Sequence, residues 1–241
     1  MKYLFITFFT VCIFNFCQAQ LDMDISASAA GSYSTLRFDE LKLTGQKKLD
    51  KVENSDIGGS PFWLDKWNAA MIYTSTYRVL IPKVKLNLYT NDVYYINKDG
   101  ETLVVQKGQI KRITFFKGDD TSYLLGSFIY MKIPGDDSFH FYQPLINGKA
   151  GLIKLNKVFV NKLAYDPISG KSDFNYITKS AYYLNYNGNL QLLKILNKES
   201  IFAVLKPAAV ADDWLAKNKN KLRTETDIIQ FLYYFNGQAN E

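Results

Sequence analysis

Apolar and polar residues alternate over short segments between residues 58 and 116, and turn residues separate the segments. In segment 84–89, three aliphatic residues occupy the even positions, whereas Lys85, Asn87 and Tyr89 occupy the odd positions. Side chains of an extended chain alternate between two faces, so this pattern is typical of a strand with one face on a core. Several such segments, joined by short polar turns, predict an antiparallel meander.

The same pattern continues to residue 196. Further strands are expected at 123–133, 138–143, 152–163, 176–186 and 190–195. Asn187-Gly188 lies between the last two, and this dipeptide favours the positive φ angles of a tight hairpin turn. We therefore predict an antiparallel β body over residues 58–196.

After Asn197 the apolar period changes from two to about 3.6, which is typical of amphipathic helices. Helices are expected at 199–205 and 208–218, and Thr224 and Asp227 resemble a capping box that opens a third. No long linker precedes this segment, so residues 197–241 are predicted to be a helical tail packed on the same domain. The expected fold is mainly β: an antiparallel meander forming a sandwich or a partly closed barrel, with two or three short C-terminal helices.

The first 19 residues have the features of a signal peptide. Lys2 precedes an apolar run over 4–16, and Cys17-Gln18-Ala19 provides a small-x-small cleavage pattern. The run is shorter than the roughly 20 apolar residues that span a bilayer. Cleavage is expected after Ala19. Lipid attachment to Cys17 is a rival reading, but Phe16 stands where lipoprotein signals have a small residue. We predict an exported protein, periplasmic or extracellular, with no transmembrane segment in the mature chain.

Residues 20–57 form an N-terminal extension with a weak pattern. The apolar positions change from even to odd numbers near residues 39–40, so either one bulged strand or two short strands fit the stretch 36–43.

Composition excludes several chemistries. Both cysteines lie in the predicted leader, so the mature chain offers no thiolate nucleophile or thiolate metal site. His140 is the single histidine, and no nucleotide-binding glycine motif occurs. The net charge is +6, but the lysines are scattered rather than clustered, so we expect no nucleic-acid partner. We predict no cofactor and no metal.

Carboxylates give one enzymatic alternative. Gly118-Asp119-Asp120 and Gly135-Asp136-Asp137 are similar pairs, and both occupy expected turns, where aspartate is common. A hydrolase of envelope polysaccharide would need two carboxyl groups roughly 5–9.5 Å apart in one cleft. Asp92, Asp119 and Asp136 are its candidates.

Aromatic residues suggest the leading hypothesis, because the chain contains 17 Tyr, 17 Phe and 3 Trp. One ring of a Tyr-Tyr pair in a strand is expected to face solvent or a helix, and outward rings provide a platform for a partner. We therefore predict a non-enzymatic binding or interaction protein that contacts an envelope protein or a glycan through an aromatic β-sheet face. A periplasmic lipid carrier is a further alternative. The predicted binding residues are Lys85, Asn87, Tyr89, Tyr94, Tyr95 and Tyr183.

From Gly58 onward, the chain resembles a family of secreted Bacteroidota proteins. The resemblance is carried by residues 59–62, by the meander segment 84–92 and by the ending 222–236. It implies export and a strand-rich body, and it implies no catalytic residues.

Overall fold

The computed structural model describes residues 34–38, 47–48, 57–106, 108–118, 120–166, 171–206, 208–218 and 222–238. The strands are β1 Ser34–Leu36, β2 Lys47–Lys48, β3 Ile57–Gly58, β4 Asn68–Tyr73, β5 Tyr77–Asn87, β6 Asp92–Ile96, β7 Thr102–Val104, β8 Arg112–Lys117, β9 Asp120–Met131, β10 His140–Ile146, β11 Ala150–Asp166, β12 Lys171–Tyr186 and β13 Asn189–Leu193. The helices are α1 Lys198–Leu205, α2 Ala208–Lys217 and α3 Glu225–Gln238.

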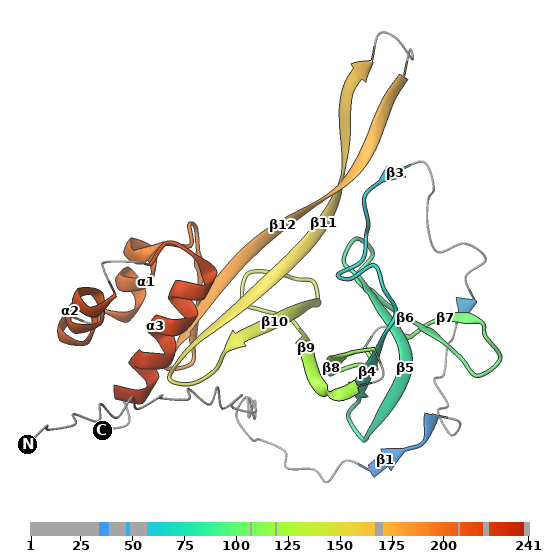
Figure 1. The fold of residues 1–241 in the computed structure, drawn as a ribbon, viewed down its shortest axis with the longest axis horizontal. Coiled ribbons are helices and arrows are strands. Elements are labelled where there is room, and N and C mark those ends of the chain that lie inside the picture. Colours follow the sequence, from blue (N-terminus) through green and yellow to red (C-terminus); the bar gives the residue numbers. More distant parts are fainter. Residues whose placement is uncertain are drawn as a thin grey trace, which may run out of the picture.

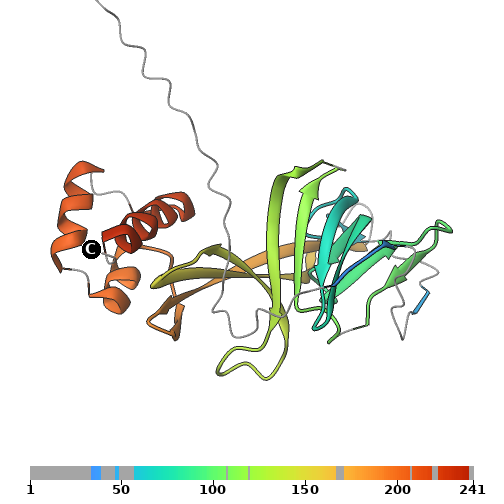
Figure 2. The same ribbon diagram turned by 90° about the horizontal axis from the view of Figure 1, so that it is seen from below.

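The strands join in a single, mostly antiparallel sheet that is not closed into a barrel (Figures 1 and 2). Its order is β13-β12-β11-β10-β9-β8-β4-β5-β6-β7-β2, with β1 added in parallel to β5 and β3 in parallel to β12. The predicted β-rich class with C-terminal helices is confirmed. The expected strand or strands at 36–43 lie largely outside the described residues.

The first hydrophobic core lies within the curled half of the sheet, where β4 to β9 surround it. Fully buried aliphatic and aromatic side chains fill it, including Ile72, Ile81, Ile113 and Phe115. Trp63, from the segment before β4, packs on this core with its ring 4.8 Å from that of Phe128.

The second hydrophobic core lies between the three helices and one face of β10 to β13. Leu152 and Leu184 from the sheet meet Ile201, Ile228 and Phe231 from the helices, and all five are almost completely buried. Figure 2 shows the helices at one end of the molecule and the curled strands at the other.

Local sequence explains where these helices begin. The Asn197 side chain accepts a hydrogen bond from the Ser200 amide at the start of α1. At α3, Thr224 Oγ1 accepts from the Asp227 amide while the Asp227 carboxylate accepts from the Thr224 amide, which is a reciprocal capping box. No helix among the described residues is long and apolar enough to cross a membrane.

The longest strands form a ribbon that leaves the sheet. β11 and β12 pair from Ala150↔Tyr186 to Asp166↔Lys171, whereas β10 pairs with β11 no farther than Leu155. Beyond that point Val158 and Tyr176 still pack on the first core, and the outer part of the two strands projects past the rest of the sheet (Figure 1), accompanied by β3 at a short parallel pairing. We call residues 156–166 and 171–180 the arm.

Candidate functional site

The six residues predicted to form a binding face do not share an exposed surface. Tyr89 is 50% exposed, and Tyr183 is half-buried on β12. The other four side chains are 2–9% exposed: Lys85, Asn87, Tyr94 and Tyr95.

The burial has a tertiary cause, because residues 61–63 pair with the end of β5 through backbone hydrogen bonds and the rings of Phe62 and Trp67 lie against Lys85. Phe62 forms an isolated antiparallel β-bridge with Asn87. The Phe62 ring meets the Tyr94 ring edge-on, with the two centroids 5.7 Å apart. Lys85 Nζ lies 4.5 Å from the centre of the Phe62 ring and 5.2 Å from that of Trp67. The expectation that one ring of the Tyr94-Tyr95 pair faces solvent or a helix is therefore wrong, since both rings are buried and Tyr94 meets Phe62, which lies outside the helices.

Asn87 has a local structural role. Its side-chain oxygen accepts hydrogen bonds from the backbone amides of Tyr89 and Thr90, both at 2.9 Å, and so stabilises the turn that follows β5. Tyr89 projects from this turn, and its ring lies 5.6 Å from that of Tyr176 on the arm. Among the predicted residues, Tyr89 is the one that the structure brings to the arm.

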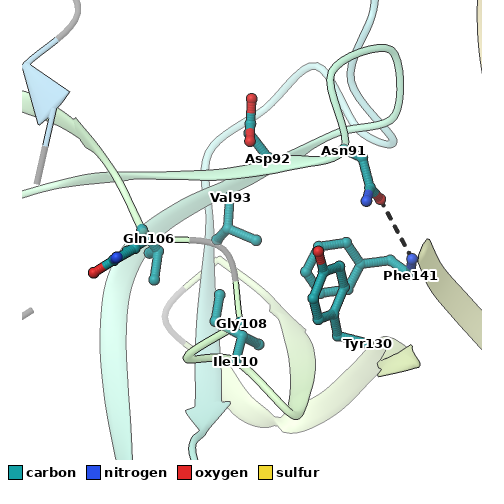
Figure 3. A pocket seen from close by; sticks show the side chains of 9 residues that line it. Asn91, Asp92, Val93, Gln106, Gly108, Ile110, Tyr130 and Phe141 are labelled. Carbon is teal, nitrogen blue, oxygen red and sulfur yellow. Dashed lines mark hydrogen bonds between the residues drawn. The ribbon is translucent and has the colours of Figure 1, made fainter. Parts of the chain in front are cut away.

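A small pocket opens at one end of the first core, between β6 and the strands β9 and β10 (Figure 3). Its cavity volume is about 10 Å³, whereas drug-sized ligands occupy sites of about 300–1,000 Å³. The floor is apolar and buried, with Val93, Ile110 and Phe141 among its lining residues. The polar ends of Asp92 and Gln106 point away from this floor in Figure 3.

Asn91 closes one side of the pocket and is held on both of its polar atoms. Its side-chain oxygen accepts a hydrogen bond from the Phe141 amide, which Figure 3 shows. Its side-chain nitrogen donates to the Phe139 carbonyl. The residue adopts a positive φ of 58°, which asparagine tolerates better than most residues. Asn91 therefore ties the β5–β6 turn to β10.

The hydrolase candidates do not come together. Asp92 lines the pocket, Asp136 does not, and Asp119 lies outside the described residues. Asp136 is instead engaged by His140 Nε2 at 3.3 Å and Lys157 Nζ at 3.7 Å. These contacts fasten the loop between β9 and β10 to the base of the arm.

The charges of this cluster are set by its surroundings. A hydrogen bond from the Ser138 amide, together with Lys157 and His140, lowers the pKa of Asp136, so the carboxylate is ionised at neutral pH. Burial, reinforced by Lys157, lowers the pKa of His140, although Asp136 acts in the opposite direction. His140 is consequently neutral at neutral pH, and because its Nε2 faces the carboxylate, this nitrogen carries the proton. Among the described residues, no group of three or more His, Cys, Asp or Glu side chains is placed to hold a metal ion.

Tyr183 lies next to this cluster, on the face of the sheet opposite the helices. Its ring meets the fully buried Tyr142 edge-on at 5.9 Å. Burial, with a smaller effect of Asp136, raises the pKa of Tyr183. The residue is thus part of a packed layer rather than of an open platform with Lys85 or Tyr89.

The arm carries exposed apolar residues that the sequence patterns did not single out. Phe159 and Ile177 face each other across the two strands and are 44% and 37% exposed. Phe174 and Leu163 are exposed to a similar extent. The sequence does contain a signal for these residues: apolar side chains occur at both odd and even positions of the strand. An antiparallel strand with one face on a core has apolar residues at alternate positions only.

Comparisons with protein-family models, with curated proteins and with solved structures give no match to this chain.

Proposed function

We propose that the chain is an exported, non-enzymatic interaction protein that binds a component of the cell envelope through the arm. The observation that carries this proposal is the exposed cross-strand pair Phe159 and Ile177, which lies beyond the last β10 pairing, on the face of the ribbon opposite Val158 of the first core. Export follows from the predicted signal peptide. The proposed binding surface still includes an exposed aromatic ring, but it lies on the arm and not on the meander.

Energetics favour a covered arm. Full burial of a Phe, Leu or Ile side chain contributes about 1.5–3 kcal/mol, so covering the exposed two-fifths of Phe159 or Ile177 would contribute roughly 1 kcal/mol each. A two-stranded ribbon gains little stability on its own in water. A partner that covers the arm would thus gain binding free energy and order the ribbon at the same time.

The enzymatic and carrier alternatives receive less support. The pocket in Figure 3 brings in one of the three candidate aspartates, and its carboxylate points away from the floor. The same pocket is smaller than usual ligand sites, which disfavours a lipid carrier that uses it.

Site-specific photo-crosslinking tests the proposal. Benzoylphenylalanine replaces Phe159 in one variant and Tyr233 in the other, since both are exposed aromatic residues and Tyr233, 72% exposed, lies on α3 at the other end of the molecule. After irradiation of cells that export the protein, we expect adducts from position 159 and none from position 233. Equal adducts from both positions, or none from position 159, would refute the proposal.

A further inference from the structure

We infer that the partner of the arm is an anionic lipid surface, and this inference rests on the proposed function. It assigns to the arm the role of a peripheral membrane anchor. Apolar side chains, charge and backbone pairing along the arm support this role.

Apolar side chains occupy both faces of the ribbon. Phe159 and Ile177 share one face because they are paired across the strands, and Phe174, three residues before Ile177, lies on the opposite face. All three are 37–44% exposed. A folded protein partner covers one side of such a ribbon, whereas a lipid interface surrounds a structure that enters it.

Positive charge accompanies these residues. The sequence of the arm contains four lysines and two aspartates, within a chain of net charge +6, and one of these lysines, Lys157, is paired with Asp136 at the base of the arm. Lys162 and Lys179 are exposed, and Lys179 Nζ lies 5.5 Å from the centre of the Phe159 ring. Lysine stems lie along apolar surface while their ammonium groups reach headgroups, and each lysine near an anionic membrane strengthens binding several-fold. The charge and the apolar groups of the arm therefore complement an acidic bilayer surface.

Backbone pairing limits the depth of insertion. β11 has no strand partner from β10 beyond Leu155, and the Val158 amide donates to the Leu88 carbonyl, so the edge farther out carries backbone groups that need water or another polar partner. Such groups are not tolerated in the hydrocarbon core. The arm is consequently expected to lie at the headgroup level, with its rings at the boundary of the acyl chains, and not to span the bilayer.

Vesicle co-sedimentation of the exported, purified protein tests the inference. The probes are vesicles of phosphatidylethanolamine with roughly one-third phosphatidylglycerol, and vesicles of phosphatidylcholine alone. The apolar variant combines Phe159→Ser with Ile177→Ser. Its matched control combines Leu192→Ser with Tyr233→Ser, which removes two exposed apolar side chains elsewhere.

A second pair of variants tests the charge. Lys162→Glu with Lys179→Glu alters the arm, and Lys98→Glu with Lys194→Glu changes total charge equally at exposed positions outside it. We expect the wild-type protein to bind the anionic vesicles at least about tenfold more tightly than the neutral ones. Both arm variants should lose about tenfold or more, and both controls should lose less than about twofold. Urea unfolding midpoints establish that every variant is folded.

Absence of binding to anionic vesicles overturns the inference, as does an equal loss in arm and control variants. Binding that soluble heparin abolishes, and that the apolar variant retains in full, identifies a general polyanion interaction and also overturns it. Failure of the proposed function is distinguishable: adducts from position 159 to a protein or glycan, without vesicle binding, refute the lipid partner and leave the interaction function standing.

Discussion

The amide side chain of Asn236, near the end of α3, connects the helical layer to the turn between β10 and β11. Its oxygen accepts a hydrogen bond from the Ala150 amide at 2.8 Å. Its nitrogen donates to the carbonyls of Asn147 and Ala150 at 3.1 and 3.0 Å. We predict that Asn236→Ala is among the most destabilising polar substitutions in the chain.

The magnitude follows from what the substitution leaves behind. Ala150 is completely buried, so its amide loses a partner that water does not replace, at a cost of about 1–3 kcal/mol. The two carbonyls lose donors, each with a net contribution of roughly 0.5–1.5 kcal/mol. Partial relaxation of the turn offsets some of this, and we expect a loss of about 2–4 kcal/mol, a large share of the roughly 5–15 kcal/mol of an ordinary domain.

Urea unfolding followed by tryptophan fluorescence measures this loss. Asn161→Ala, at an exposed position on the arm, is the matched control and should change stability by less than about 0.5 kcal/mol. A Cβ at Gly148, where φ is 131°, would lie 2.5 Å from the Asn236 side-chain nitrogen. Gly148→Ala should therefore cost less in the Asn236→Ala background than alone. A loss at Asn236 no larger than that of the control would refute the reasoning.

Three further predictions concern packing and pH. Gly126→Ala places a Cβ 2.9 Å from the Trp63 ring, so we expect a loss of about 1–3 kcal/mol in urea unfolding and a shifted tryptophan emission; an unchanged midpoint would contradict it. Burial raises the pKa of Glu225, but hydrogen bonds from Lys154 at 2.7 Å and from a tyrosine outweigh it, so the net pKa is lowered. The Glu225 carboxylate is then harder to protonate in the folded state than in the unfolded state. The free energy of unfolding, measured with urea, should fall as the pH decreases from about 5 to 3, and it should fall less steeply in Glu225→Gln. Burial lowers the pKa of His140 below 6.5, so the wild-type protein should lose stability as the pH falls below 6.5. If a His140→Gln variant shows the same dependence of unfolding free energy on pH in this range, the assignment is wrong.

Local signals in the sequence predicted the elements well. Asn187 and Gly188 both have positive φ, at 52° and 81°, as the predicted tight hairpin requires. Thr224 and Asp227 exchange the two hydrogen bonds of a capping box even though Asp replaces the usual Glu or Gln. These features depend on neighbours within a few residues, and a single sequence contains that information.

The candidate site was harder to predict because its exposure is decided by distant segments. Alternation in 84–89 correctly separates two faces, but it contains no sign that distant rings lie against Lys85 on the second one. Likewise, the run from 152 to 163 reads as one strand of a sheet. Phe159 pairs with β12 on one side, and whether β11 also has a strand on its other side at this position depends on where β10 ends, which is a property of the pairing register.

A binding surface must be available without disrupting a core, and this condition separates the two aromatic regions. Exposing Tyr94 would require removal of Phe62 from its edge-on contact, and burial of one such ring contributes about 1.5–3 kcal/mol that a partner would have to replace. Phe159 requires no such opening, because its side chain is already 44% exposed, on the face of the ribbon opposite the buried Val158. Tyr89 joins the two regions through its contact with Tyr176, so a Tyr89→Ala effect on partner binding would be mediated by the position of the arm. The aromatic interaction hypothesis thus places its binding residues where exposure has no cost in folding free energy.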